Sequence, residues 1–163
     1  MANPLPRFPA SLSAGAGGAA RFILDPARFA VRGTVPASLS GRIEDRFEEE
    51  SLSLISASIQ AAETLPETRV LPVYVPVSGG TPYVATGRAT IRFREGEDAN
   101  AHAEALRGHG YRITQVPLYA PHMAWIEGVS DDVARMLAGL GQLASLPGVE
   151  HVEPQLISRG EKR

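Results

Sequence analysis

The sequence contains no cysteine among its 163 residues, which excludes disulfide bonds, thiolate metal sites and cysteine nucleophiles. This absence is typical of cytoplasmic proteins, and we expect that location. The sequence also lacks the run of about 20 apolar residues that a membrane-spanning helix requires. Residues 1–20 have neither the charged region nor the continuous apolar region of a secretory signal. No membrane partner is therefore expected.

An excess of positive charge is absent as well. The chain has 16 Lys and Arg against 18 Asp and Glu, and its formal net charge is -2. Nucleic-acid phosphates attract clustered Lys and Arg, so nucleic acid is not an expected partner. The apolar fraction of 44% and the charged fraction of 21% are typical of globular proteins.

No motif for catalysis or metal binding is recognisable. The four histidines lack the compact spacing of a metal site. There is no G-x-S-x-G elbow to carry a nucleophilic serine, and the glycine-rich segments do not join a strand to a helix as phosphate loops do. We therefore expect no enzyme activity, no metal and no cofactor. The histidines are His102, His109, His122 and His151.

The first half of the chain is predicted to be an extension of a smaller domain. Residues 1–20 are expected to be a flexible leader, because their prolines oppose a helix and their Gly, Ala and Ser have little to bury. Residues 21–87 form the extension proper. Within it, residues 70–86 alternate around Ser-Gly-Gly, which predicts a hairpin, and its prolines indicate edge strands.

Residues 38–63 are predicted to form a long amphipathic helix. Leu39, Ile43 and Phe47 recur at intervals of four residues, and apolar residues continue the stripe beyond them. The acidic run at 48–50 occupies the other face. It is either a solvated surface or a docking surface for a basic partner.

Residues 88–157 show a regular alternation of strand and helix patterns. The order is strand, helix, strand, strand, helix, strand, which predicts a ferredoxin-like α+β sandwich with four antiparallel strands and two helices on one face. The six expected elements cover residues 89–93, 98–107, 111–116, 123–127, 130–146 and 149–153.

Three segments of this region occur together in a known family. An alternating strand ends in a charged residue and glycine at Ile91–Gly96, and a later strand opens with the aromatic Tyr111. A helix then stops at Pro-Gly before the Val-x-x-Val-Glu of residues 149–153. In these features the chain, from Ala89 to about Ile157, resembles the subtilisin propeptide-like inhibitor family, which includes free-standing relatives of protease propeptides. It departs from many relatives in having Pro-Gln where they carry two acidic residues.

The resemblance implies that the protein inhibits, or assists the folding of, a separately encoded subtilisin-like serine protease. In that family the open face of the sheet packs on the protease, and the residues after the last strand run through the substrate cleft. An extended tail gains main-chain hydrogen bonds there, and a folded domain raises its effective concentration. Residues 158–163 are the expected terminal tail. The implied cleft-binding residues are Gln155, Leu156, Ile157, Ser158, Arg159, Gly160 and Glu161.

Strand alternation predicts which side chains occupy the open face. If Ile91 and Phe93 point toward the helices, the intervening residues point away from them. Aromatic residues, Met and Arg are favoured at protein interfaces, so this face is a candidate binding surface. Alternatively, the N-terminal extension covers the face and makes its tryptophan part of the core. The expected interface residues are Arg92, Met123, Trp125, His151 and Glu153.

Two other function classes share the expected order of elements. RNA-recognition domains stack bases on sheet aromatics, but residues 122–127 are neither basic nor punctuated by glycine. A ferredoxin-like regulatory or protein-interaction module is the other alternative, on fold analogy alone.

Overall fold

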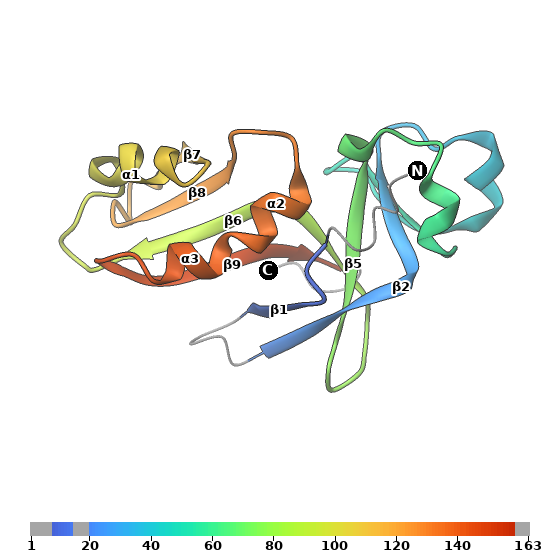
Figure 1. Ribbon diagram of the computed structural model, residues 1–163, viewed down its shortest axis with the longest axis horizontal. Helices are drawn as coiled ribbons and strands as arrows, with labels where there is room; N and C mark the ends of the chain where they lie inside the picture. Colours follow the sequence, from blue (N-terminus) through green and yellow to red (C-terminus); the bar gives the residue numbers. More distant parts are fainter. Residues whose placement is uncertain (1–7, 15–19, 159–163) are drawn as a thin grey trace. The chain divides into compact units, whose positions relative to one another are not determined.

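A computed structural model of the chain describes residues 8–14 and 20–158 (Figure 1). These residues form nine strands and only short helices. The strands are β1 (Ser11–Ala14), β2 (Ala20–Arg32), β3 (Ile43–Phe47), β4 (Leu52–Ile55), β5 (Val70–Pro76), β6 (Tyr83–Phe93), β7 (Tyr111–Gln115), β8 (Met123–Gly128) and β9 (Val149–Ile157). The helices are α1 (Ala103–Gly108), α2 (Val133–Ala138) and α3 (Leu140–Ala144), with 3-10 turns η3 (Ala37–Arg42), η4 (Ile59–Ala62), η5 (Glu67–Arg69) and η6 (Ala99–His102).

The strands belong to one mostly antiparallel sheet, so the predicted ferredoxin-like two-helix sandwich is wrong. The hydrogen-bonding order is β3-β4-β2-β5-β6-β8-β7, while β1 pairs with β2 and β9 pairs with β6. The prediction failed because β6 begins at Tyr83, before the expected domain, and pairs there with β5. The backbone groups of β6 thus continue the ladder into the N-terminal half.

The chain divides into two compact units. The N-terminal unit is Met1–Leu12 with Arg21–Thr86 and Leu156–Arg163, and the C-terminal unit is Ser13–Ala20 with Gly87–Gln155. Strands β6 and β9 each contribute residues to both units. Part of the segment expected to be a leader therefore belongs to the C-terminal unit.

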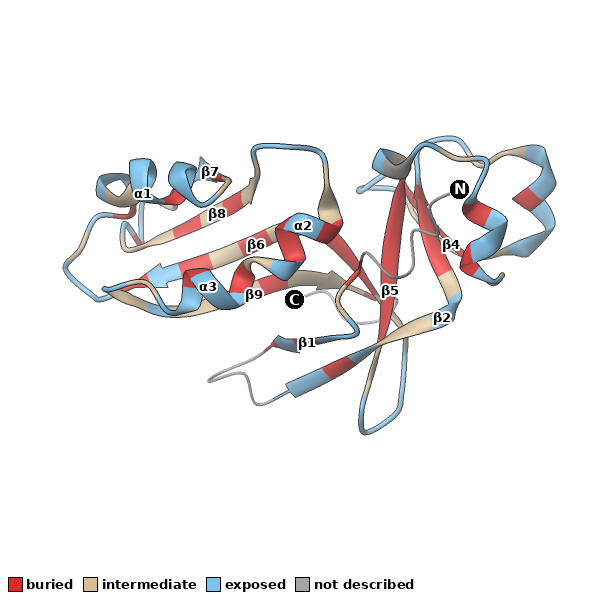
Figure 2. Cartoon of the chain, in the orientation of Figure 1, coloured by how far each residue is buried: buried red, intermediate tan, exposed pale blue. Residues whose placement is uncertain are grey.

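In the N-terminal unit the helix predicted over residues 38–63 is wrong. Those residues form η3, the antiparallel hairpin β3–β4 and η4, with Phe47 opposite Leu52 in the hairpin. All four residues of β4 are buried, because β4 lies between β3 and β2. Figure 2 shows burial concentrated along β5, which lies on the other side of β2 from β4.

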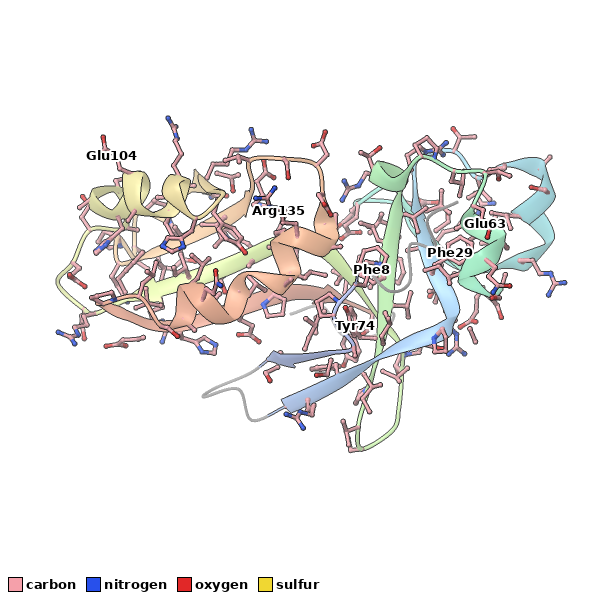
Figure 3. All side chains as sticks on the ribbon, in the orientation of Figure 1. Phe8, Phe29, Glu63, Tyr74, Glu104 and Arg135 are labelled. Carbon is pink, nitrogen blue, oxygen red and sulfur yellow. The ribbon has the colours of Figure 1, made fainter. Side chains whose placement is uncertain are left out.

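The flexible leader predicted for residues 1–20 is also wrong for its described part. Residues 11–14 form β1, and Phe8 is buried. The hydroxyl of Tyr74 on β5 donates to the carbonyl of Pro9, the residue after Phe8, at 2.9 Å; Phe8 and Tyr74 are labelled in Figure 3. Burial raises the pKa of Tyr74 above its ordinary value, so this donor stays protonated.

The expected hairpin around residues 70–86 is present, since Val73 pairs with Val84 in an antiparallel ladder. However, β5 is not an edge strand, because it lies between β2 and β6. Pro76 and Pro72 of β5 lie opposite Phe22 and Phe29 of β2, and the register of this pairing shifts between Leu24 and Phe29. A break in the ladder of this kind accommodates prolines within a sheet.

In the C-terminal unit the strand order is β9-β6-β8-β7. Helix α1 packs on β7 and α2 packs on β8. The helix predicted over residues 130–146 is divided into α2 and α3 at Gly139. The start of β9 lies beside the end of β6, where the Arg94 N–H donates to the Gly148 carbonyl at 3.0 Å.

Candidate functional site

The pairing of β6 with β8 separates a helix-covered face from an open face. Ala89, Ile91, Ala124 and Ile126 are buried on one side. On that side a Cβ added to Gly128 would lie 3.4 Å from the Cβ of Met136 on α2. Side chains of the other parity lie on the opposite side. This open face consists of Arg88, Thr90, Arg92, Arg112, Met123, Trp125 and Glu127.

Trp125 is held at the middle of the open face. It lies opposite Thr90 in the β6–β8 register, and the guanidinium carbon of Arg88 is 5.0 Å from its ring centroid. The Thr114 hydroxyl donates to the Trp125 carbonyl at 3.3 Å. Trp125 is half-buried, unlike the core residues of the same strand. A cation over a fixed indole ring forms a rigid surface with both apolar and positive character.

The other arginines of the open face have different partners. Arg92 is exposed, and its Nη2 lies 3.7 Å from the sulfur of Met123. Arg112 pairs with Glu127, its Nε donating to Oε1 at 2.8 Å. Glu127 offsets the charge of Arg112 and also lies opposite Arg88 in the β6–β8 register, whereas Arg92 is exposed.

His151 and Glu153 form a separate pair on β9. Nε2 of His151 lies 3.3 Å from Oε2 of Glu153, and both side chains are half-buried. The structure thus brings Arg92, Met123 and Trp125 together, as the sequence predicted, and places the other two expected residues on the neighbouring strand.

The expected cleft-binding tail does not begin where the sequence indicated. Gln155, Leu156 and Ile157 belong to β9, which is four residues longer than the strand predicted at 149–153, and Ser158 is buried. β9 pairs with β6 along one edge, so these residues are held in the sheet. The remaining expected residues, Arg159, Gly160 and Glu161, lie outside the described residues.

Within residues 8–14 and 20–158, no group of three or more His, Cys, Asp or Glu could hold a metal ion. His102 instead stacks on Phe93, with ring centroids 4.0 Å apart. No helix in this part of the chain combines the length and the apolar character needed to cross a membrane.

Sequence reasoning missed three surface residues of the C-terminal unit, of which Arg88 is half-buried. Arg88 lies on the same face of β6 as Thr90 and Arg92, so extending the alternation from Thr90 by two residues toward the N-terminus would have found it. Leu118 and Tyr119, in the loop between β7 and β8, are almost fully exposed. Their position between two prolines was the available signal.

Comparison of the chain with protein-family models, with curated proteins and with solved structures found no match.

Proposed function

We propose that the protein binds another protein through the open face of its C-terminal unit, and that this partner is a separately encoded subtilisin-like serine protease, which it inhibits or helps to fold. The main support for this proposal is Trp125, which is half-exposed and has the guanidinium group of Arg88 over its ring. Trp125 lies on the side of β6 and β8 opposite α2. The resemblance of residues 89–157 to propeptide-like inhibitors supplies the identity of the partner.

The composition of the open face favours a protein partner. Trp, Arg and Met are enriched in the buried centres of protein interfaces, and Trp and Arg are frequent hot spots. Arg92 is exposed and lies two residues from Thr90, which is opposite Trp125, so it favours a partner surface that offers an acidic group beside an apolar centre.

In this proposal the cleft-binding segment starts after Ser158. It comprises Arg159, Gly160 and Glu161, because the residues up to Ile157 belong to β9 and Ser158 is buried. An extended peptide adds main-chain hydrogen bonds in a protease cleft. The docked open face keeps that peptide at a high effective concentration, so cleaved ends separate slowly.

The test is titration of the purified protein against a panel of subtilisin-like proteases, with residual activity and complex formation as readouts. Trp125→Ala and Arg92→Ala are each expected to weaken inhibition at least about tenfold. Arg135→Ala is the matched control, since Arg135 is an exposed arginine on α2 and lies outside the open face.

The outcomes separate the parts of the proposal. Absence of any complex with every protease contradicts the proposed partner. A complex that is insensitive to Trp125→Ala contradicts the role of the open face. Salt-dependent retention of single-stranded RNA, lost in Trp125→Ala, would replace the proposal with nucleic-acid binding.

The cytoplasmic location expected from the sequence is part of the same proposal. Cell fractionation with a tagged full-length chain tests it, and recovery outside the cytoplasm would contradict it.

A further inference from the structure

Met123 on the open face is more accessible than the other methionine that the structure describes. The sequence has three methionines, of which Met1 lies outside the described residues. Met136 on α2 is buried, whereas Met123 is half-buried at the first position of β8. Oxidants convert an accessible thioether to a sulfoxide, so the two residues are expected to differ in reactivity.

The sulfur of Met123 lies beside a guanidinium group. Arg92 and Met123 are opposite each other in the β6–β8 register, and Nη2 of Arg92 is 3.7 Å from the sulfur. A thioether sulfur is only a weak hydrogen-bond acceptor, so this contact uses little of the donor capacity of the arginine. The oxygen of a sulfoxide is polar, and an oxygen bonded to this sulfur lies within reach of the guanidinium N–H groups.

Main-chain hydrogen bonds fix both residues in place. The Met123 N–H donates to the Ala120 carbonyl at 3.0 Å, and the Phe93 N–H donates to the His122 carbonyl at 2.8 Å. Because these bonds involve the backbone alone, a change at the sulfur leaves them intact. Arg92 is therefore held beside the sulfur before and after oxidation.

We propose that Met123 is a site of reversible oxidation by hydrogen peroxide, and that Arg92 binds the oxygen that is transferred. The sulfur lone pair forms a bond to one peroxide oxygen as the O–O bond breaks. Sulfur is oxidised to the sulfoxide, and the peroxide is reduced, its second oxygen leaving as water with both protons. The guanidinium group stabilises the negative charge that develops on oxygen during this step.

Oxidation would replace an apolar group of the open face by a polar one, two residues from Trp125. Methionine sulfoxide reductases restore the thioether, and each of the two classes acts on one sulfoxide epimer. Since Arg92 lies on one side of the sulfur, one epimer is expected to predominate. Oxidation of Met123 does not depend on which partner the open face binds.

The test treats the full-length chain with dilute hydrogen peroxide and follows each methionine by peptide mass spectrometry. Met123 is expected to react at least about tenfold faster than Met136, whose sulfur becomes accessible only when α2 opens locally. This comparison requires no variant.

Reduction of the oxidised chain by each reductase class in turn measures the ratio of the two epimers at Met123. One epimer is expected in at least about threefold excess, the factor that a single hydrogen bond supplies. Arg92→Ala is expected to make the two epimers nearly equal. Arg94→Ala is the matched control, because Arg94 is an exposed arginine directly after β6, and it is expected to keep the excess.

Trp125 provides a second measurement, because it is the only tryptophan of the chain. Oxidation is expected to shift its fluorescence emission to longer wavelength, and reduction to reverse the shift, whereas Met123→Leu is expected to show no shift. Unchanged unfolding midpoints verify that the variants remain folded.

Three results would overturn the proposal. One is equal oxidation rates for Met123 and Met136 in the folded chain. Another is an epimer ratio that is the same in Arg92→Ala as in the unaltered chain, which would remove Arg92 from the reaction. The third is an emission shift that persists in Met123→Leu, because oxidation would then act on the open face through another residue.

Discussion

At the scale of single residues, the hydroxyl of Tyr111 joins β7 to the end of α2. It donates to the carbonyl of Met136 at 2.5 Å, and the ring is buried. Gly139 follows α2, and a Cβ added there would overlap this hydroxyl. Gly139→Ala is therefore expected to lower the free energy of unfolding by about 1–3 kcal/mol, as overpacking does. Urea denaturation followed by circular dichroism measures the loss.

Gly141→Ala is the control for this prediction. Gly141 lies in α3, and nothing lies within 4 Å of a Cβ added to it. Alanine is the better helix former, so this variant is expected to be neutral or to gain up to about 1 kcal/mol. Equal losses in the two variants would show that the Tyr111 hydroxyl does not cause the effect.

The same tyrosine makes stability depend on alkaline pH. Burial raises the pKa of Tyr111 to about 12, whereas the unfolded chain titrates it near its ordinary value of 10.0. The folded state therefore holds the phenolic proton more tightly. Its stabilising contribution is complete below pH 10.0 and decreases as the pH rises toward the folded pKa.

Between those two pKa values, Tyr111 alone lowers the free energy of unfolding by about 1.4 kcal/mol per pH unit. Tyr74, whose pKa is also raised by burial, adds to the slope. Urea denaturation at several pH values from 8 upward is expected to show a shallower decline for Tyr111→Phe than for the unaltered chain. Parallel declines would contradict the assignment to Tyr111.

At the scale of elements, the β3–β4 hairpin turns through a residue with unfavourable backbone geometry. Ser51 has φ of 56°, the only positive value among the described residues other than glycine. Its carbonyl accepts from the Gly33 N–H at 2.8 Å, so the conformation is fixed by the residue that follows β2 as well as by the turn. Ser51→Gly is expected to stabilise the protein by about 0.5–1 kcal/mol, because relief of the strain exceeds the added freedom of the unfolded chain.

Ser40→Gly provides a control of opposite sign. Ser40 lies in η3, has no positive φ, and its hydroxyl donates to the Ala37 carbonyl at 2.8 Å. Glycine at position 40 relieves no backbone strain and removes the hydroxyl hydrogen bond. The free energy of unfolding is therefore expected to fall by about 0.5–1 kcal/mol. Thermal unfolding of both variants distinguishes strain relief from a general effect of glycine.

The same hairpin explains why part of the fold was not predictable from the sequence. Leu39, Ile43 and Phe47 are spaced by four residues, which fits one helical face but also equals two repeats of a strand. The acidic run that looked like the polar face of a helix is the exposed turn between β3 and β4. In the C-terminal unit, strict alternation such as Ala89, Ile91 and Phe93 fits a strand and no helix, so a strand was expected there, although β6 begins earlier, at Tyr83.

The candidate site was partly predictable for the same reason. The alternation of side chains along β6 and β8 predicted that Arg92, Met123 and Trp125 lie on one face, and the register confirms this placement. Parity does not show where a strand ends, however. Val149–Glu153 carried the recognisable pattern, while the residues up to Ile157 continue the ladder without one. Long-range pairing decided that boundary, and no local pattern encodes it.

In the molecule as a whole, the residues of β9 are divided between the two compact units. Its residues up to Gln155 belong to the C-terminal unit, and Leu156 and Ile157 belong to the N-terminal unit. A truncation within β9 therefore removes a part of the fold, whereas a truncation after Ser158 leaves every residue of β9 in place. The two truncations separate the contribution of the C-terminal residues to stability from their contribution to inhibition.

Removal of residues 155–163 is expected to lower the free energy of unfolding by roughly 2 kcal/mol or more relative to removal of 159–163, because it deletes paired backbone and the half-buried Leu156 and Ile157. The shorter truncation then tests the cleft-binding segment alone. If Arg159, Gly160 and Glu161 occupy the protease cleft, this variant still forms the complex through the open face but loses inhibition of peptide hydrolysis. Undiminished inhibition by the folded variant would mean that the open face blocks the enzyme without a tail in its cleft.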